Sequence, residues 1–532
     1  ITIEKTTEMK HLSIIFAASL LSMPLSAQET YENANLATQD LNGTARYVGM
    51  GGAMDALGAD ISTIGTNPAG IGLFRRSTAN ITASLVSQQG ANDFNNADKS
   101  KLSLDQAGFV YAMRTGKSSF LNFAFNYHKS RNFNNILSAA GNLNNASQNK
   151  LSALKGYLGA FNIRENQNEL TGDSRAFSQV DYLYYNALGL YDAGNFYYNN
   201  ADGYMFDRSS SGYIGEYEFN ISGNHNDRIY WGLTVGISDV HYNGYSEYFE
   251  SLLNEDGNYI GDVGIADNRK ITGTGFNVKA GIIFRPIEDS PMRFGLSVAT
   301  PTWYDLTTSN YTEIGNWTTV GQAESGYISE SYDFKLYTPW KFGASFGTTV
   351  GNYLAIGAGY EYADYSHLDS RENTGGTYDW YYDEYWESSS SDHDMNNHTK
   401  QTLKGVSTFK IGIEAKPIEE LAIRAGYNYV SPMYKKDGYK DSTIDSWGSY
   451  YASQTDFVNW KDTNRFTFGL GYYLGKFNID LAYQYTAQNG DFYPFTSYFA
   501  SSNEDAGMNN ICKSAKVDNK RHQVMVTLGY KF

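Results

Sequence analysis

Residues Gly43 to Phe74, GTARYVGMGGAMDALGADISTIGTNPAGIGLF, form a stretch rich in Gly and Ala that precedes a long series of predicted strands. Each glycine costs a helix about 1 kcal/mol relative to alanine, and the stretch lacks the alternation typical of a strand. Within it, Asn67-Pro68-Ala69-Gly70 fits a tight turn, because Asn accepts local backbone hydrogen bonds, Pro presets φ and Gly supplies positive φ. We therefore predict a compact, irregular plug.

The chain before this stretch has the features of an export signal. Residues 9–11 (Met-Lys-His) give a basic start, residues 12–21 form a short apolar core, and a small residue ends the region. We predict a signal peptide over residues 1–27, of which residues 1–8 resemble upstream sequence read in frame. The mature chain is expected to begin at Gln28.

After the plug, the chain consists of segments in which apolar and polar residues alternate with period two, which indicates strands with two different faces. The apolar faces of four such segments comprise Leu121, Phe123, Phe125 and Tyr127; Trp231, Leu233, Val235 and Ile237; Phe276, Val278, Ala280, Ile282 and Phe284; and Phe466, Phe468, Leu470 and Tyr472. Asn, Thr, Lys and Gly occupy many of the opposite positions. Such strands suit a membrane barrel, in which only every second residue faces lipid.

The connections between these segments favour a barrel over a soluble sandwich. We count about fourteen strands joined alternately by short connections, such as residues 351–352 and 475–476, and long ones, such as residues 131–211 and 367–401. Short periplasmic turns and long outer loops are typical of transmembrane β-barrels with an even strand number. The sequence predicts an all-β, antiparallel transmembrane barrel of about 14 strands over residues 77–532.

The composition argues against several other classes of protein. The net charge of −16 disfavours nucleic-acid binding, which depends on Lys and Arg against phosphates. Cys512 is the single cysteine, so neither an intrachain disulfide nor a Cys-rich metal site is expected. No Lys-Ser/Thr follows Gly49 to Gly52 as in a P-loop, and His128 and His522 lack a defined serine partner. We therefore predict that the protein is not an enzyme and binds no metal or cofactor. We also predict a monomer, because a closed barrel has no free sheet edges.

With these features in place, the chain resembles the FadL-type family of outer-membrane transporters for long-chain fatty acids and aromatic hydrocarbons. The residues that carry the likeness are Gly43, Ala45, residues 49–53, Ala59, Asp60, Asn67, Pro68, Ala69 and Phe74, with looser support from the strand number and the terminal Phe532. Phe532, at the end of an alternating last strand, also resembles the signal read by the barrel assembly machinery. We refer to residues 28–76 as the hatch segment.

The resemblance implies both a location and a mechanism. It places the chain in the bacterial outer membrane, with the hatch segment inside the barrel lumen at the periplasmic side. It implies passive uptake of a hydrophobic small-molecule ligand, a movement of the hatch that includes the Asn67-Pro68-Ala69-Gly70 turn, and lateral exit of the ligand towards outer-membrane lipid.

Charged residues on the polar faces of the predicted strands are candidates for ligand contact. We expect most of them to pair with one another and with the hatch segment, because buried charges need partners. Arg424 is the candidate for a ligand carboxylate, since its guanidinium fork suits bidentate contact.

The long connection over residues 131–211 carries a helical pattern. Leu151, Leu154, Leu158 and Phe161 recur at helical spacing, and a second such run follows between residues 180 and 191. We predict two short amphipathic helices over the barrel mouth. Their apolar faces either form a groove that captures a hydrophobic ligand or pack on each other.

Two other functions fit the same pattern. One is a haem-binding outer-membrane receptor, for which His393 and His398 or a Tyr are the available ligands. The other is a non-transporting barrel that serves as a scaffold for protein secretion or lipid handling. The acidic and aromatic stretch over residues 379–394 lacks the spacing of a calcium loop, so we expect a solvated surface there.

Overall fold

The computed structural model describes residues 29–95, 97–166, 169–288, 290–321, 326–381, 384–501 and 505–532, and the predicted signal peptide lies outside these ranges. Within them, no helix is long and apolar enough to cross a membrane. The helices are α1 (Thr30–Ala37), α2 (Ala45–Gly49), α3 (Gln148–Tyr157), α4 (Gln179–Leu188), α5 (His393–Thr402) and α6 (Trp447–Tyr450), with 3-10 turns η1 (Ile61–Gly65), η2 (Pro68–Leu73), η3 (Tyr365–His367) and η4 (Ala506–Met508).

The remaining elements are strands. They are β1 (Thr78–Gln88), β2 (Ser100–Arg114), β3 (Phe120–Asn132), β4 (Asn135–Ala146), β5 (Ile163–Asn166), β6 (Glu169–Gly172), β7 (Tyr191–Asp192), β8 (Asn195–Phe196), β9 (Asn200–His225), β10 (Ile229–Leu253), β11 (Tyr259–Phe284), β12 (Arg293–Ala299), β13 (Trp303–Asn316), β14 (Gly326–Tyr337), β15 (Lys341–Val350), β16 (Leu354–Asp364), β17 (Asp369–Asp379), β18 (Glu384–Ser391), β19 (Gly405–Ile418), β20 (Leu421–Val430), β21 (Phe457–Leu474), β22 (Phe477–Tyr493) and β23 (Ala515–Lys531).

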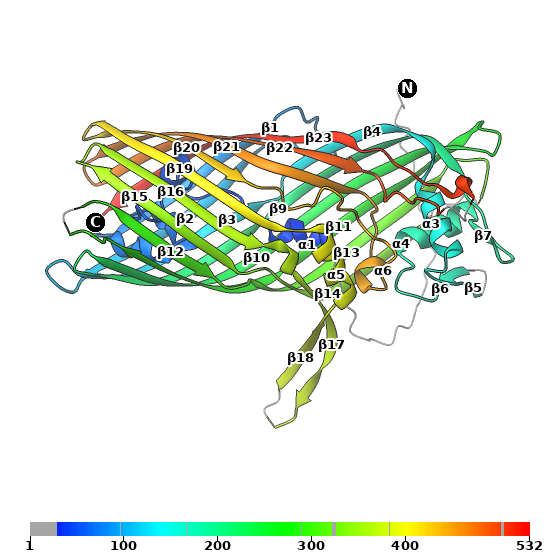
Figure 1. Cartoon of the computed structure of the whole chain (residues 1–532), viewed down its shortest axis with the longest axis horizontal. Helices are drawn as coiled ribbons and strands as arrows, with labels where there is room; N and C mark the ends of the chain where they lie inside the picture. The colour runs from blue at the N-terminus through cyan, green and yellow to red at the C-terminus, as the bar shows by residue number, and fades with distance from the viewer. Residues whose placement is uncertain are drawn as a thin grey trace.

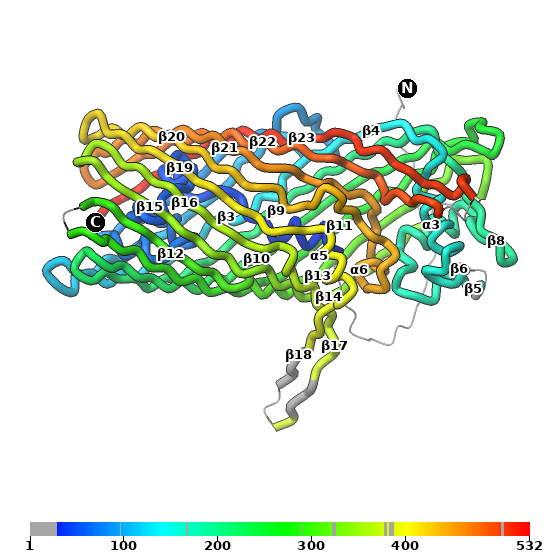
Figure 2. Tube along the Cα trace, in the orientation of Figure 1, coloured from blue at the N-terminus to red at the C-terminus, as the bar shows by residue number. Residues whose placement is uncertain are grey.

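These strands close into one antiparallel barrel of 14 wall strands, which confirms the predicted fold class (Figures 1 and 2). The barrel is sealed by the pairing of β1 with β23, from Thr78↔Lys531 to Gln88↔Arg521. Some wall strands are interrupted, so that β3 continues as β4, β12 as β13, and β14 as β15. The short turns lie at the end of the barrel nearest the C-terminus, and the long connections lie at the other end.

The alternation along each strand separates a lipid-facing side from the lumen. On β10, Trp231, Leu233 and Ile237 are each 43% exposed, whereas Thr234 and Ser238 are buried. Beyond Ile237, the next three residues on the outward side are polar, namely Asp239, His241 and Asn243. The lipid-facing band of β10 therefore ends near Ile237, and more than half of the strand, up to Leu253, extends past the band.

The hatch segment packs inside the end of the barrel that carries the short turns. Its helix α2 contacts β20 to β23, and its turn η2 contacts β9 to β11. Close approach to the wall depends on glycine: Gly51 has φ +63°, and a Cβ there would lie 2.8 Å from the Tyr427 nitrogen. On the wall side, a Cβ at Gly232 would lie 2.4 Å from the Pro68 carbonyl carbon. The Asn67-Pro68-Ala69-Gly70 turn is thus held directly against β10.

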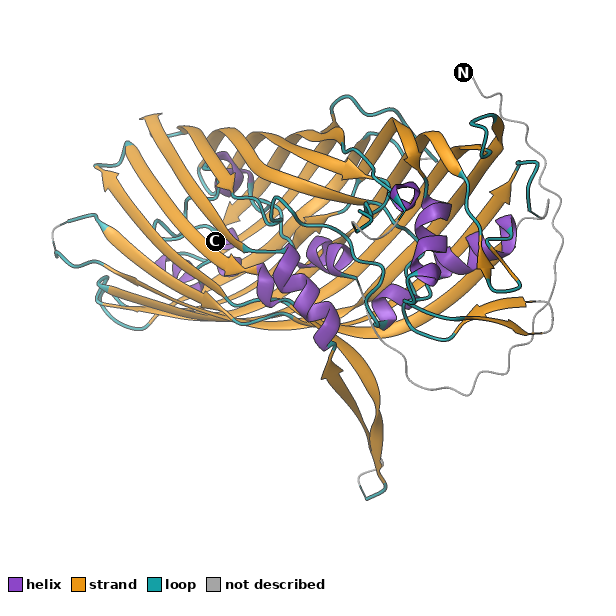
Figure 3. Cartoon of the chain, turned by 45° about the vertical axis from the view of Figure 1, so that its right-hand side comes forward, coloured by secondary structure: helices purple, strands orange, loops and turns teal. Residues whose placement is uncertain are grey.

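Helices close the opposite end of the barrel, where the long connections gather (Figure 3). Helices α3 and α4 form where the helical spacing predicted them, although α3 ends at Tyr157, before two of the predicted residues. We call this region the cap (residues 147–199). The long connections were predicted too long, because residues 131–211 also contain β4 and the start of β9, and residues 367–401 contain β17, β18 and α5. Polar strands beyond the lipid band lack the apolar alternation on which the prediction relied.

Candidate functional site

The lumen holds a cavity of about 370 Å³, lined by the hatch segment and by the wall strands and their connections. Its lining includes the aromatic residues Tyr31, Phe133, Tyr242, Tyr365, Tyr434, Phe457 and Trp460. It also includes charged residues, with cations in excess: Arg131, Arg208, Arg269, Lys279, Lys341, Lys410, Lys440, Lys461, Arg465 and Arg521 against Glu29, Glu32, Asp40, Glu216, Glu361 and Asp456. A volume of this size and an amphipathic lining suit a small organic ligand.

The strongest concentration of charge surrounds Asp40 of the hatch segment. Arg131 Nη1 lies 3.1 Å from Asp40 Oδ1, and Arg465 Nη2 lies 4.0 Å from the same oxygen. Burial alone would raise the pKa of the Asp40 carboxyl, but the charges of Arg131, Arg521 and Arg465 and the N–H of Asn132 hold that pKa below its usual value. Three guanidinium groups therefore face a single carboxylate. We call Arg131, Arg465 and Arg521 the arginine cluster.

The cluster keeps hydrogen-bonding capacity that Asp40 does not use. Arg131 Nε is buried without a hydrogen-bond partner among the described residues. Arg521 donates to the Asn519 side chain at 3.0 Å and to the Asn132 carbonyl at 3.4 Å, and Arg465 donates to Asn428 at 2.8 Å. Neutral oxygens thus satisfy part of the cluster, and its excess positive charge suits a carboxylate.

Arg424, the residue predicted to meet a ligand carboxylate, lies elsewhere. Its Nε is 2.6 Å from Glu414 Oε2 and its Nη1 is 2.6 Å from Asp480 Oδ1. Glu414 also binds Arg46 of the hatch segment at 3.0 Å. Arg424 is 1% exposed and is not among the described residues that line the cavity. Its charge is matched inside a network that holds the hatch, as expected for most of the lumen charges.

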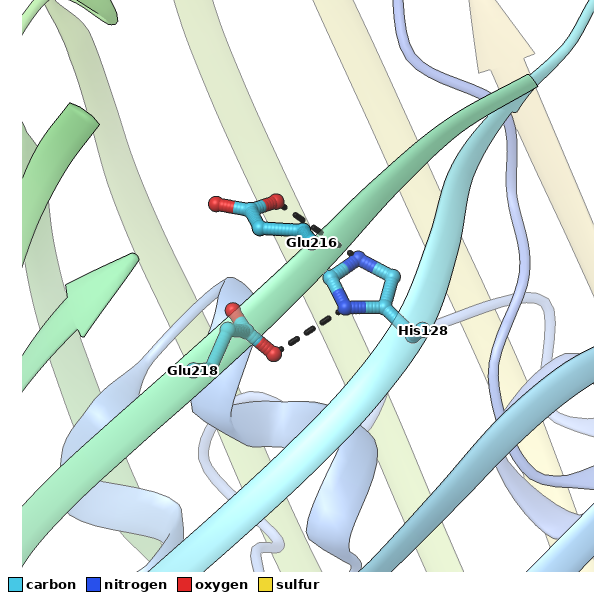
Figure 4. A group of neighbouring side chains, drawn as sticks. All are labelled: His128, Glu216 and Glu218. Atoms are coloured by element: carbon cyan, nitrogen blue, oxygen red, sulfur yellow. Dashed lines mark ion pairs between the residues drawn. The ribbon is translucent and has the colours of Figure 1, made fainter. Parts of the chain in front are cut away.

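A second charged group lies on β3, β9 and β11 and is drawn in part in Figure 4. His128 Nδ1 is 3.0 Å from Glu218 Oε2, and His128 Nε2 is 3.8 Å from Glu216 Oε2. These three residues could hold a metal ion by their spacing. However, the ammonium group of Lys279 lies 2.6 Å from Glu216 and 2.8 Å from Glu218. The lysine supplies the cation that the two carboxylates need, and the group serves as an ion-pair network.

The barrel wall contains a gap between β2 and β3. Backbone pairing of these strands extends only from Arg114↔Phe120 to Gln106↔His128. Over residues 100–104, the described pairing of β2 is with β1 alone, while β3 shifts its register on β9 after Lys129. On the outer side of this gap, Leu102 is 86% exposed.

Side chains rather than backbone hydrogen bonds close this gap. Lys129 Nζ donates to Ser103 Oγ at 2.5 Å across the two strands. From inside the barrel, Asn42 of the hatch segment donates to Asp105 Oδ1 at 3.2 Å and to the Lys129 carbonyl at 3.0 Å. Asn42 also lines the cavity. A hatch residue therefore lies between the cavity and a part of the wall that lacks backbone pairing.

Most of the other residues that were predicted to form a functional site have a structural role. Asn67 accepts a hydrogen bond from the Ala69 N–H at 3.2 Å and begins η2, and the Asn67 to Gly70 turn is not among the described cavity-lining residues. In the cap, Leu151, Leu154 and Phe161 are buried. Leu151 and Phe161 belong to one buried apolar cluster with Val180 and Leu183 of α4, whereas Leu158 is 43% exposed.

His398, one of the two histidines considered for haem, has protein partners on both ring nitrogens. His398 is 4% exposed. Its Nδ1 is 3.0 Å from Thr30 Oγ1 and its Nε2 is 2.9 Å from the Tyr439 carbonyl. Both ring nitrogens therefore have protein partners, so the structure gives the haem hypothesis no specific support.

Comparison with known proteins shows which solved structures share this architecture. No model of a known family and no curated protein matches the chain. Among solved structures, a FadL homologue from Pseudomonas aeruginosa matches with a TM-score of 0.50 at 10% identity, covering 93% of this chain and 100% of that chain. The toluene transporter TodX from Pseudomonas putida has a TM-score of 0.48 at 10% identity, covering 93% of this chain and 100% of that chain.

The fold therefore belongs to the class of transmembrane β-barrels. Within that class, the chain has the FadL-type fold, as the resemblance of its hatch segment implied.

Proposed function

We propose that this protein lies in the bacterial outer membrane and takes up hydrophobic small molecules passively, with a long-chain fatty acid as the best-fitting ligand. The observation that carries the proposal is the amphipathic cavity, whose aromatic residues suit an apolar chain and whose arginine cluster suits a carboxylate. Aromatic hydrocarbons fit the aromatic residues but leave the cluster without an anion. The cap lies above the cavity, and the gap between β2 and β3 lies beside it.

Ligand binding and hatch movement are linked through Asp40. Asp40 is bound to β3 and its extension by Arg131, by the Asn132 N–H at 2.9 Å, and through its own N–H to the Ser130 carbonyl at 2.8 Å. A ligand carboxylate at the arginine cluster competes with Asp40 for the same guanidinium groups. Asn42 is only two residues further along, so release of Asp40 loosens the residue that lies at the wall gap.

The energies involved are small enough for such a gate. Asn42 makes two hydrogen bonds at the gap, and a typical hydrogen bond contributes about 0.5–1.5 kcal/mol net. Withdrawal of Asn42 therefore costs on the order of 1–3 kcal/mol, which a bound ligand can offset. The ligand would then leave sideways, past Leu102 and into the lipid phase.

A reversible crosslink between the hatch and the wall tests this gate. The test uses the double variant Asn42→Cys with Asp105→Cys, whose two thiols are joined by a short bis-methanethiosulfonate linker that reductant removes. The crosslink should abolish uptake of radiolabelled oleate by cells. Addition of reductant should restore it. The single variant Asn42→Cys, treated identically, serves as the control, and the native Cys512 is buried.

Equal uptake by the crosslinked and reduced forms would contradict exit through this gap. Equal uptake by cells with and without the wild-type protein would remove fatty acid as the ligand, and would favour the non-transporting scaffold.

A further inference from the structure

Strands β17 and β18 form a hairpin that leaves the barrel wall and projects sideways, across the long axis of the barrel (Figures 1 and 3). The two strands pair with each other from Arg371↔Ser391 to Asp379↔Glu384. Only the root is attached to the wall, through the pairing of β17 with β14 at Lys335↔Arg371, Leu336↔Ser370 and Tyr337↔Asp369. An isolated two-stranded hairpin is marginally stable in water, so an arm of this kind needs a surface to rest on.

The direction of the arm is fixed at its root by Arg371. The Arg371 guanidinium lies over the Tyr337 ring at 4.9 Å and 2.8 Å from Asp369 Oδ2. It also donates to the Ser389 carbonyl at 2.8 Å and to Ser391 Oγ at 2.9 Å, on the opposite strand of the hairpin. One side chain therefore joins both strands to the wall, and the arm has a defined orientation.

The arm leaves the wall at the edge of the lipid-facing band. The outward aromatic residues of the neighbouring wall strands at this level are Trp303, Trp340, Phe342 and Tyr362, which are 36%, 50%, 55% and 38% exposed. The arm begins at Asp369, paired with Tyr337, only a few residues beyond Trp340. Trp and Tyr concentrate where a membrane barrel meets the lipid headgroups. An arm that leaves at this level and runs across the barrel axis lies along the membrane surface.

The tip of the arm presents a large aromatic side chain. Trp380 is 83% exposed, the second highest value among the exposed large hydrophobic residues of the described chain after Leu102. At about 3.3 Å per residue, the chain from Arg371 to Trp380 reaches roughly 30 Å from the wall. Ser and Thr along the ribbon suit a hydrated surface rather than the hydrocarbon core, where unpaired strand edges are not tolerated.

We propose that the β17–β18 hairpin is a membrane-surface arm that rests on the lipid headgroups beside the barrel, with Trp380 in the interface. The two strands of the hairpin carry acidic residues in their sequence, namely Asp379, Glu384 and Glu387. Zwitterionic headgroups are therefore the surface that it fits. The arm lies about half of the barrel circumference away from the gap between β2 and β3, so it steadies the barrel without covering the gap.

Depth-dependent fluorescence quenching tests the proposal. The purified full-length protein is placed in phosphatidylcholine vesicles with brominated acyl chains, and its tryptophan quenching is compared with that of Trp380→Phe. Trp317→Phe is the matched control, because Trp317 is 62% exposed and follows the end of β13, 14 residues beyond Trp303. We expect Trp380→Phe to remove part of the bromolipid quenching, and Trp317→Phe to remove quenching by aqueous iodide only.

The opposite pattern overturns the proposal. If Trp380→Phe leaves bromolipid quenching unchanged and lowers iodide quenching as Trp317→Phe does, the tip lies in water, and a protein partner becomes the better explanation. Folding of both variants is checked by heat-modifiable migration in gels. Arg371→Ala, which releases the root, should reduce the bromolipid quenching of Trp380 in the same assay, and unchanged quenching would contradict the role of the root.

Discussion

At the scale of single residues, two inward-facing arginines on neighbouring parts of the wall have different roles because of what lies opposite. Arg424 is enclosed by Glu414 and Asp480, each at 2.6 Å. Arg521 shares the one carboxylate of Asp40 with two other arginines. The position of a residue on its strand predicts that both point inward, but it does not predict the partners, which come from distant segments. We therefore propose the arginine cluster, and not the predicted Arg424, as the contact for a ligand carboxylate.

Removal of one guanidinium from the cluster should weaken anion binding selectively. Hydrogen bonds to charged groups contribute about 1.5–3 kcal/mol, so Arg521→Gln should lower the affinity for oleate about tenfold to hundredfold. The affinity for oleyl alcohol, which has no charge, should be unchanged. Calorimetric titration of both ligands into the detergent-solubilised protein checks this. Arg228→Gln is the control, since Arg228 is 43% exposed and pairs with the exposed Glu288; an equal loss for both ligands in Arg521→Gln would point to misfolding instead.

At the scale of elements, the helix α3 in the cap depends on a carboxyl group from a strand. Glu250 on β10 lies beyond the lipid-facing band, and its Oε1 accepts the Gln148 N–H at 2.5 Å and the Tyr248 hydroxyl at 2.6 Å. Negative charge near a helix N-terminus is favourable. Burial is the larger effect here and raises the pKa of Glu250 to about 7.

The raised pKa predicts how the stability of the cap depends on pH. A carboxyl whose pKa is higher in the folded state binds its proton more tightly there, so stability is greatest below about pH 4.5, falls as pH rises towards 7, and is level above that. The loss is on the order of 3 kcal/mol at most. Hydrogen exchange of the α3 amides, corrected for intrinsic rates, measures it.

Substitution of the carboxyl identifies the source of this pH dependence. Glu250→Gln should remove the slope, whereas Glu247→Gln, three residues earlier on the same strand, should leave it intact. A slope that persists in Glu250→Gln would show that another group titrates.

At the scale of the whole molecule, the barrel is closed twice, by the hatch segment at one end and by the cap at the other. Buried apolar clusters mark both closures, one around Met50 and Met54 and the other around Tyr184 and Phe492. The cavity lies in the lumen beside the hatch segment, and side chains rather than backbone hydrogen bonds join the wall at the gap between β2 and β3. This arrangement favours passage of one small amphipathic molecule at a time over a water-filled pore.

Closure of the barrel at both ends predicts how strongly deletion variants conduct ions. Removal of residues 29–76 should leave the barrel wall intact, because β1 pairs with β23 independently of the hatch. In planar lipid bilayers, this variant should conduct weakly, and additional replacement of residues 147–199 by a short linker should raise the conductance severalfold. The cap deletion alone is the control and should stay closed. Full conductance after loss of the hatch alone would contradict closure by the cap.

The amino-acid sequence by itself determined the barrel, its approximate strand number and the lipid-facing residues, because alternation is a local property that each strand carries independently. Trp231, Leu233 and Ile237 face outward as their spacing predicts. The hatch turn at Asn67 to Gly70 was equally visible, since its turn chemistry is local. The sequence also indicated the helices of the cap, and it left open whether their apolar faces form a groove or pack on each other.

Tertiary structure alone decided the candidate site. The arginine cluster joins residues from β3, β21 and β23 to Asp40, and the wall gap depends on where the β2 and β3 pairing stops. Pairing of buried charges is set by three-dimensional distance, and many pairings are compatible with one pattern of inward positions. The β17–β18 arm was hidden for a related reason: polar strands beyond the lipid band have no apolar face, so their pairing is visible only in the folded barrel.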